Sequence, residues 1–533
     1  MRPVHKSALV VLSLSLAAAG LAGCGGGSSA SPGSTSSANF VNGKTFTMAE
    51  SQDPGSLDPQ MSAVDTLIQL SLFAYDPLVG IDPKTGQPVP QLASSWTTSA
   101  TKATFDIKSG VTCSDGAPFT AQTAADNIKF VEDPSNKSPL LGAFVPAGVT
   151  ASASGSTLTL KLSSPSPFLL SSISSLPMVC DKGLKDRSML KSQTDGTGPY
   201  VLSKASPNSE YDYTVRKGYT WGPSGASTSD AGTPASIVVK VVPNETTEAN
   251  ELLAGQLNAA SIVGSDRTRL KGAGLTSIDV PLIVGEQWYN QAAGHATSDP
   301  KVRLALTQAL DLGQLQKVIT SNLGGPATQL AVVEPTGCQG NSVEGNVPAL
   351  DVAAAKATLA SDGWTPGSDG ILAKDGKKLS LSMLYDTSLG NGGDAAAELA
   401  VQQWKAIGVD VTTKAQTETA MSSALFGTGD WDIAWEPLNI NNPDQLIPFF
   451  SGPAAPKGTN FASVDNPTYT STTAKALKED GASGCADWHA AEAALFKDAD
   501  VVPFANNLLP TFVKGATLQI AGDIVPTSIK MLG

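Results

Sequence analysis

The sequence predicts an α/β fold, because strand-like and helix-like segments alternate along the chain. The strand-like segments are short runs of β-forming residues, and the helix-like segments repeat apolar residues at helical spacing. The strand-like runs are 46–49 (FTMA), 103–107 (ATFDI), 157–162 (TLTLKL), 236–242 (SIVVKVV) and 409–411 (VDV). The helix-like runs are 299–319, 394–407 and 487–496.

Two of the helix-like runs carry end signals. The helix expected over 299–319 has Asp299 as a capping residue and Pro300 in its first turn. The helix expected over 394–407 ends before Gly408, a residue type that favours a helix C-terminus. We therefore predict one helix over each of these runs.

The N-terminal sequence has the pattern of an export signal. Residues 1–23 combine a short basic start with an apolar run that is shorter than the roughly 20 residues of a membrane span. Residues 21–24 (LAGC) resemble the lipobox of bacterial lipoproteins, which implies cleavage before Cys24 and lipid on its thiol. An ordinary signal peptide followed by a chance cysteine is the alternative. Residues 24–39 are rich in Gly and Ser and are expected to form a flexible tether.

Composition argues against several functions. The formal net charge is −13 and the chain has only six Arg and no dense basic run, so we expect no nucleic-acid partner. Three His residues leave little for imidazole metal ligation, and we expect no metal site and no cofactor. Residues 188–191 (SMLK) match a short hydrolase motif, but its companion motifs are absent. We therefore expect no catalytic residues.

Several segments follow the motif order of one known family. They are 56–59 (SLDP), 75–79 (YDPLV), 86–96 (GQPVPQLASSW), 105–111 (FDIKSGV), 114–121 (SDGAPFTA), 196–200 (GTGPY) and 299–306 (DPKVRLAL). In this order, over roughly residues 45–510, the chain resembles the family 5 extracellular solute-binding proteins, the peptide/nickel-type receptors of ABC importers.

The resemblance implies a periplasmic-binding-protein-like fold of type II, in its large three-subdomain variant. Two lobes would then enclose a ligand cleft and move about a hinge. We expect lobe 1 over 40–285, with an inserted subdomain at about 76–190. Lobe 2 would cover 286–498, and 499–533 would return to lobe 1.

The resemblance also implies a function in which no covalent bond is made or broken, so we expect that the protein is not an enzyme. The chain would be a monomeric, extracytoplasmic, lipid-anchored substrate-binding protein on the outer face of the cell membrane, or on the periplasmic side if an outer membrane exists. It would capture an oligopeptide or a similar small organic solute and deliver it to ABC permease subunits. The alternatives are an oligosaccharide or metal-chelate receptor, a sensor-coupled receptor and, more remotely, a secreted hydrolase.

The ligand pocket is expected in residues 431–450. Peptide-binding relatives carry an Asp here that pairs with the peptide ammonium, and Asn439 stands at that place, or Asn441 if the alignment slips by two residues. A neutral amide binds an ammonium more weakly than a carboxylate does. We therefore expect this position not to anchor a free amine, although Glu436 could substitute for the missing Asp. A polar surface loop is the competing interpretation.

Aromatic rings complete the predicted pocket. Trp435 lies within the same segment, and Trp288 and Tyr289 precede it in the chain. Flat rings beside amide groups suit sugars and peptide backbones equally. Burial of Trp288 and Tyr289 in a core next to the hinge is an equally good interpretation.

Other motif residues are expected to be structural. Trp96, Phe105 and Val111 suit a core better than a ligand site, and Arg303 on its helix suits an ion pair. Four further cysteines in an exported chain favour disulfides, although free buried thiols are an alternative. We favour the pairings that keep each bond within one expected lobe, which are Cys113–Cys180 and Cys338–Cys485.

Overall fold

The computed structural model describes residues 39–62, 64–142 and 144–533. The predicted signal peptide, Cys24 and the tether up to residue 38 lie outside these residues. None of the described helices is both long enough and apolar enough to cross a bilayer.

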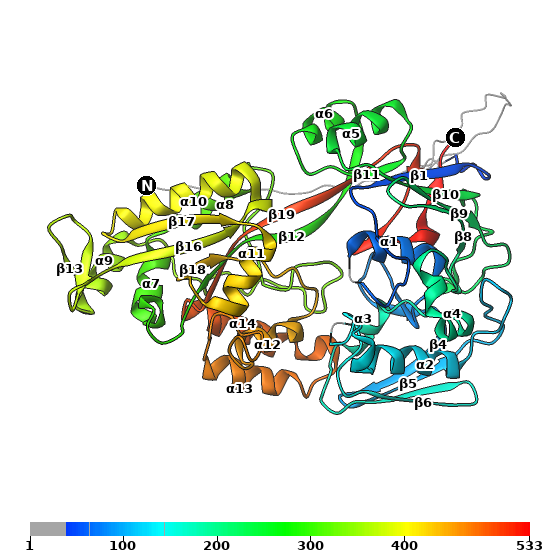
Figure 1. Ribbon diagram of the computed structural model, residues 1–533, viewed down its shortest axis with the longest axis horizontal. Helices are drawn as coiled ribbons and strands as arrows, with labels where there is room; N and C mark the ends of the chain where they lie inside the picture. Colours follow the sequence, from blue (N-terminus) through cyan, green and yellow to red (C-terminus); the bar gives the residue numbers. More distant parts are fainter. Residues whose placement is uncertain (1–38, 63, 143) are drawn as a thin grey trace, which may run out of the picture. The chain divides into compact units, whose positions relative to one another are not determined.

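A ten-stranded sheet organises the molecule (Figure 1). Its strands are β1 (Thr45–Glu50), β8 (Tyr200–Ser206), β9 (Glu210–Val215), β10 (Ser236–Val241), β11 (Ala259–Ser261), β12 (Thr276–Tyr289), β16 (Ser380–Asp386), β17 (Asp410–Gln416), β18 (Ile433–Trp435) and β19 (Val501–Val513). Their order is β17-β16-β18-β12-β19-β11-β1-β10-β9-β8. We call the part with β11, β1, β10, β9 and β8 lobe 1, and the part with β18, β16 and β17 lobe 2.

Helices accompany the strands in both lobes. They are α1 (Asp65–Ala74), α2 (Ala121–Glu132), α3 (Leu169–Ser174), α4 (Asp181–Lys185), α5 (Glu245–Ala254), α6 (Asp266–Gly272), α7 (Pro300–Gln308), α8 (Leu312–Ile319), α9 (Val352–Ser361), α10 (Gly390–Lys405), α11 (Glu418–Ser423), α12 (Ile447–Phe450), α13 (Pro467–Ala476) and α14 (Cys485–Lys497). Strands thus alternate with helices, and the predicted α/β class is confirmed.

The helix expected over 299–319 is in fact two helices, α7 and α8. The Asp299 carboxylate caps the first by accepting a hydrogen bond from the Lys301 amide at 2.9 Å. Asp311 then caps the second by accepting from the Gln314 amide at 2.9 Å. The single-helix prediction was wrong because this internal aspartate starts a new helix where the apolar spacing alone suggests continuation.

Two long antiparallel strands, β12 and β19, join the lobes (Figure 1). At the lobe 1 end, β19 pairs with β11, where Ala260 lies opposite Phe512. At the lobe 2 end, β12 pairs with β18, where Trp288 lies opposite Ala434. Bending between the lobes therefore has to act on this pair of strands.

The β12–β19 ladder is irregular at Gly285, where the register shifts. A Cβ atom on Gly285 would lie 2.5 Å from the Phe504 ring and 2.7 Å from the Ala505 Cβ. Gly285→Ala is therefore expected to lower the free energy of unfolding by about 1–3 kcal/mol through overpacking. Urea unfolding measures this change. Gly272→Ala, at a site with no atom within 4 Å of an added Cβ, is the control, and equal stability of the two variants would contradict the prediction.

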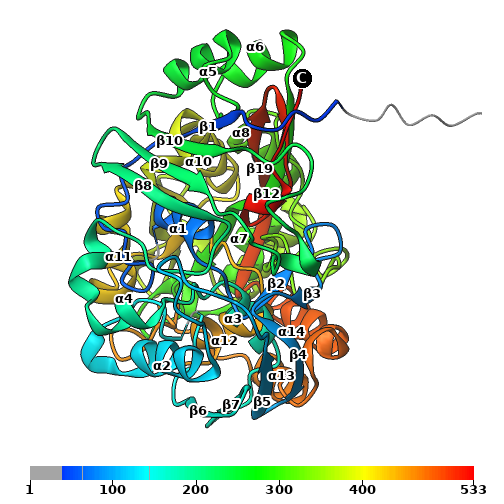
Figure 2. The same ribbon diagram turned by 90° about the vertical axis from the view of Figure 1, so that its right-hand side faces the viewer.

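Lobe 1 carries a smaller four-stranded sheet in the order β4-β5-β7-β6, which packs against α2. Its strands are β4 (Ala93–Ser99), β5 (Lys102–Ile107), β6 (Thr150–Ser154) and β7 (Thr157–Lys161). Phe105 and Val111 are buried in its core and Trp96 packs against the edge of that core, as expected. Figure 2 shows α5 and α6 at the opposite end of lobe 1 from β5, β6 and β7.

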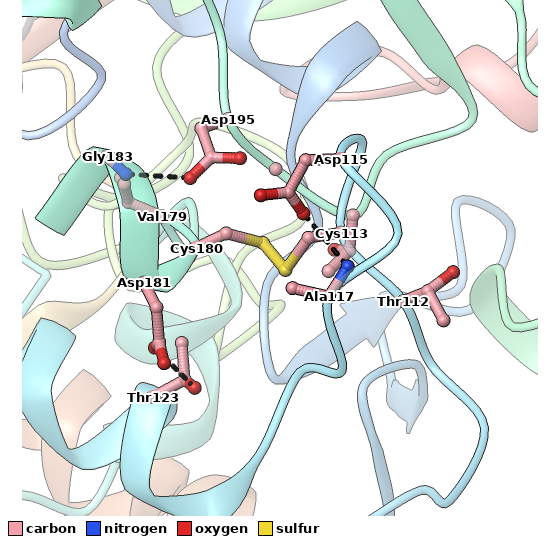
Figure 3. Close-up of a disulfide and its surroundings, with 12 residues drawn as sticks. Thr112, Cys113, Asp115, Ala117, Thr123, Val179, Cys180, Asp181, Gly183 and Asp195 are labelled. Carbon is pink, nitrogen blue, oxygen red and sulfur yellow. Dashed lines mark hydrogen bonds between the residues drawn. A yellow bond between two sulfur atoms is a disulfide. The ribbon is translucent and has the colours of Figure 1, made fainter.

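Both favoured disulfides are present, Cys113–Cys180 and Cys338–Cys485. Figure 3 shows the first bond, which ties the loop at Cys113 to the start of α4. Gly183 lies on α4, and its amide donates a hydrogen bond to the Asp195 carboxylate at 2.7 Å. The loop that follows β5 and the start of α4 are thus covalently linked within lobe 1.

Candidate ligand-binding cleft

A cavity of about 470 Å³ lies beside β12 and β19, which we call the hinge strands, and is lined by both lobes. We call it the hinge-side cavity. Its walls on the hinge strands are mostly apolar. Lobe 2 contributes Val333 and Asn439, and lobe 1 contributes acidic and polar side chains. The lining residues on the hinge strands are Val280, Leu282, Leu509 and Thr511, and those of lobe 1 include Glu50, Asp65, Thr66, Gln69, Glu248 and Asp523.

Three of the carboxyl groups that line the hinge-side cavity come from distant parts of the chain. Glu50 ends β1, Glu248 lies on α5, and Asp523 begins the short strand β22 (Asp523–Ile524). Burial and the nearby charge of Asp523 raise the pKa of Glu50 to about 7. Burial and neighbouring acids raise the pKa of Glu248 to about 8, and burial together with Asp65 raises that of Asp523 to about 7. At neutral pH these groups are only partly ionised.

A glutamine fixes the position of Asp523. Gln69 on α1 accepts a hydrogen bond from the Ile524 amide at 2.8 Å and donates to the Ile524 carbonyl at 3.2 Å. The paired strands β21 (Ile520–Ala521) and β22 are thereby held against α1. The C-terminal segment thus supplies part of the cavity wall in lobe 1.

A second cavity, of about 160 Å³, adjoins the first and shares Val333, Gly522 and Asp523 with it. It is lined by Asp76, whose buried carboxylate has a full set of hydrogen-bond partners. The carboxylate of Asp76 accepts hydrogen bonds from four side chains at 2.7–3.0 Å. These are Gln91, Thr197, Tyr219 and Trp221. Burial raises the pKa of Asp76, but this saturated network marks it as a structural group rather than a free ligand contact.

Direct contacts between the lobes lie around a third cavity of about 280 Å³. Asn442 donates to the Ser171 hydroxyl at 3.1 Å, and Thr98 donates to Asp480 at 3.0 Å. The Gly481 amide donates to the Pro167 carbonyl at 3.1 Å. The three adjoining cavities in the described part of the chain therefore follow the boundary between the lobes.

Asn439 and Asn441 are the two predicted contacts that reach these cavities. Asn439 lines the hinge-side cavity, and its amide pairs with the backbone of Ile283, accepting at 2.9 Å and donating at 3.3 Å. Asn441 lines the second cavity and accepts from the Gly337 amide through its carbonyl at 2.9 Å. Asn439 thus also serves as a structural link between lobe 2 and β12.

The three predicted aromatic contacts are core residues instead. Trp288, Tyr289 and Trp435 are each fully buried. Trp288 stacks on Phe450, and Trp435 donates to the Gln287 side chain at 3.1 Å. These contacts lie within lobe 2 and its hinge strands, so movement of the lobes would not expose the rings. For Trp288 and Tyr289 this is the competing interpretation, burial in a core next to the hinge, and a ligand role of the three rings stays a prediction.

Glu436 lies next to this core but is not among the residues that line the three cavities. Its carbonyl accepts from the Trp288 indole at 2.8 Å, and its amide donates to the Glu286 carbonyl at 3.2 Å. Substitution of Glu436 for a ligand-binding aspartate finds no support in this placement.

The acidic side chains of the cavity were missed by the sequence reasoning. One signal was available for Glu50, because ligands of α/β sheets bind beyond the carboxyl ends of parallel strands. The strand 46–49 was predicted, and Glu50 follows it directly. Glu248 and Asp523 carry no such signal.

The described residues contain no group of three or more His, Cys, Asp or Glu side chains placed to hold an ion. His295 instead contacts Asp432 at 2.9 Å.

Comparison with curated proteins finds bacterial relatives of this chain. Protein XP55 of Streptomyces lividans is 26% identical over 330 residues, which cover 59% of this chain and 56% of XP55. The nickel-binding periplasmic protein of Escherichia coli K12 is 26% identical over 387 residues, 69% of this chain and 70% of that protein. The match therefore spans little more than half of the first relative.

A solved structure supports the fold. The oligopeptide-binding protein AppA of Bacillus subtilis, in complex with a nonapeptide, superposes with a TM-score of 0.68 at 18% identity. The match covers 93% of this chain and 100% of AppA. The two-lobed periplasmic-binding architecture is therefore confirmed.

The model of the bacterial extracellular solute-binding proteins, family 5 Middle, matches residues 87–456, which is more than half of the chain. Proteins of this family bind solutes outside the cytoplasm. The chain belongs to the bacterial extracellular solute-binding proteins of family 5.

Proposed function

We propose that this chain captures an oligopeptide or a similar small organic solute between its lobes and delivers it to an ABC permease. The observation that carries the proposal is the hinge-side cavity of about 470 Å³, whose walls come from both lobes and from both hinge strands. A solute that contacts both lobes favours the closed form over the open one. Closure would then be the signal that a permease recognises.

A peptide or other organic solute agrees better with the cleft than a bare metal ion does. The AppA structure contains a nonapeptide, whereas a curated relative is nickel-binding. Around this cleft the described residues offer no clustered metal ligands. Its acidic lining would also repel an anionic chelate. Asn439 and Asn441 are the proposed polar contacts of the solute from lobe 2.

Native mass spectrometry of the full chain purified from its own cells tests this proposal. We expect a co-purified organic solute, which makes the protein more compact in small-angle X-ray scattering when it is added back to the stripped chain. The solute should be recovered unchanged after prolonged incubation. Turnover of the solute, or an unchanged scattering profile on addition, would contradict a transport receptor.

We further propose that Cys24 carries the membrane anchor. Cys24→Ala should release almost all of the protein into the soluble fraction, because two or more acyl chains make anchoring stable and their loss leaves none. Fractionation and immunoblotting measure the distribution. Ser28→Ala, in the adjacent tether, is the control and should remain with the membrane. Membrane retention of the Cys24 variant would contradict the proposal.

A further inference from the structure

We propose that the hinge-side cavity receives a cationic group of the solute, an ammonium or a guanidinium, against Glu50, Glu248 and Asp523. This inference rests on the proposed transport function and specifies the solute that the cleft selects. Basic peptides and polyamines are the two sources of such a group.

Glu248 is the strongest single observation. The residue is only 4% exposed, and it lines the cavity. Among the described residues its carboxylate has no hydrogen-bond or ion-pair partner, whereas buried carboxylates in proteins are normally paired. Glu251, one turn further along α5, is paired with Lys240 at 2.9 Å. The unpaired carboxylate of Glu248 thus faces a space large enough for a ligand group.

The other two carboxylates leave acceptor capacity open on the same cavity. Glu50 accepts one hydrogen bond, from the Thr66 hydroxyl at 3.2 Å. Asp523 receives no side-chain hydrogen bond from a described residue. A cation with several N–H donors could bind these oxygens through charge-assisted hydrogen bonds, which are stronger than neutral ones.

No cation of the described residues neutralises this cluster. The residues that line the cavity include no Lys, Arg or His. The nearby acids Asp65 and Glu245 add further negative potential at Glu50 and Glu248. Arg267 on the neighbouring α6 is directed to the Val263 carbonyl instead, at 3.5 Å. A cation from the solute would therefore remove a charge repulsion that the apo protein retains.

The apolar hinge wall suggests the shape of the cation. Val280, Leu282 and Leu509 line the same cavity as the carboxylates. Lysine and arginine side chains combine an apolar stem with a charged end, which matches this division of the walls. A basic side chain is therefore a better occupant than a bare inorganic cation.

Isothermal titration calorimetry of the full chain in detergent, at about pH 8, tests the inference. The probes are N-acetyl-trilysine amide, spermidine, trialanine, N-acetyl-trialanine amide and triglutamate. We expect the first two to bind most tightly. Glu248→Gln and Asp523→Asn should each weaken their binding about 10-fold to 100-fold, which is the loss of a hydrogen-bonded charge. N-acetyl-trilysine amide tests binding of a side-chain cation, spermidine tests binding of a polyamine, and trialanine tests binding of an α-amine.

Glu492→Gln is the matched control. Glu492 is buried in lobe 2 outside the cavity and has a pKa raised by burial to about 7, so the variant removes an equivalent charge elsewhere. It should bind the cationic probes like the parent chain.

The inference is overturned if no cationic probe binds, if the neutral or anionic probes bind as tightly, or if the cavity variants match the control. The proposed function has a separate test, because compaction by the co-purified solute does not depend on that solute being cationic.

Discussion

Replacing Arg303 with methionine is expected to lower the free energy of unfolding by about 3–5 kcal/mol, the usual cost of breaking a buried ion pair. The Arg303 and Asp500 side chains are 6% and 4% exposed, and Arg303 Nη2 lies 2.9 Å from Asp500 Oδ1. Asp500 also accepts from Asn466 at 2.8 Å and from Gln291 at 3.1 Å. Burial raises the pKa of Asp500, so a carboxylate without its arginine would be strongly unfavourable.

Chemical denaturation in urea measures the loss, and two variants control it. Arg303→Met combined with Asp500→Asn should recover part of the stability, because no unpaired charge remains buried. Lys301→Met on the same helix should cost less than about 1 kcal/mol, since Lys301 is exposed and lies 3.7 Å from Asp362. A loss for Arg303→Met as small as that for Lys301→Met would refute the structural role of the ion pair.

The motifs predicted the architecture because many of them are structural necessities of the fold. In the segment GTGPY, a Cβ atom on Gly198 would lie 2.4 Å from the Ala74 carbonyl carbon, so only glycine fits against the end of α1. In the segment SLDP, Asp58 pairs with Arg187 and thereby holds two distant parts of lobe 1 together. Arg303 forms the ion pair that the sequence favoured.

Boundaries and interruptions were harder to predict. Apolar spacing runs through residues 309–311, yet the Asp311 cap divides α7 from α8. The positions at which the chain passes between the lobes remain a prediction. The β12–β19 pair belongs to both lobes, so its residues have no sequence signal that assigns them to either one.

The candidate site was predicted only in part, because topology rather than sequence proximity builds it. Asn439 and Asn441 reach the cleft through a loop that the family motif already marked. Glu50, Glu248 and Asp523 meet only because β1, α5 and the C-terminal segment converge in lobe 1. The three aromatic rings lie in the core, and the sequence could not decide this because large rings next to a motif are as often core as ligand contacts.

Affinity for a cationic solute is expected to fall on the order of 100-fold between about pH 8.5 and about pH 5.5. The pKa values of Glu50, Glu248 and Asp523 are raised to about 7, 8 and 7, so all three groups become neutral across this range. The probe N-acetyl-trilysine amide keeps its charge throughout, because lysine titrates near pH 10. Only the protein therefore changes its charge at the site.

Calorimetry in two buffers of different ionisation enthalpy measures directly how many protons are released when the cation binds. At about pH 7, a bound cation lowers the pKa values of the three carboxyl groups, so binding should release protons. The Glu248→Gln variant should release fewer protons, and Glu492→Gln should behave like the parent chain. Affinity that is constant with pH, or proton uptake on binding, would contradict the prediction.

Glu248→Gln is expected to weaken cation binding, but the same pKa shift predicts that it raises the stability of the apo protein. Because the folded-state pKa of Glu248 lies above its ordinary value of 4.5, the folded chain binds more protons than the unfolded one between about pH 4.5 and 8. Stability contributed by this proton is lost as the pH rises through about 8. Glu248→Gln should therefore be more stable than the parent by about 1 kcal/mol at pH 8.5. This figure allows for screening by water in the cavity. Near pH 5 the two chains should be equally stable.

Urea unfolding at several pH values measures this difference in stability. A carboxylate that lowers the stability of the apo protein and raises the affinity for a cation is what a binding group requires, whereas a purely structural carboxylate would stabilise the fold. Glu492→Gln should instead lower the stability, because the Glu492 carboxylate accepts hydrogen bonds from Ser342 and from the backbone, and it should leave the cation affinity unchanged. A Glu248→Gln variant that is less stable than the parent at pH 8.5 would assign Glu248 to the structure of lobe 1 rather than to the solute.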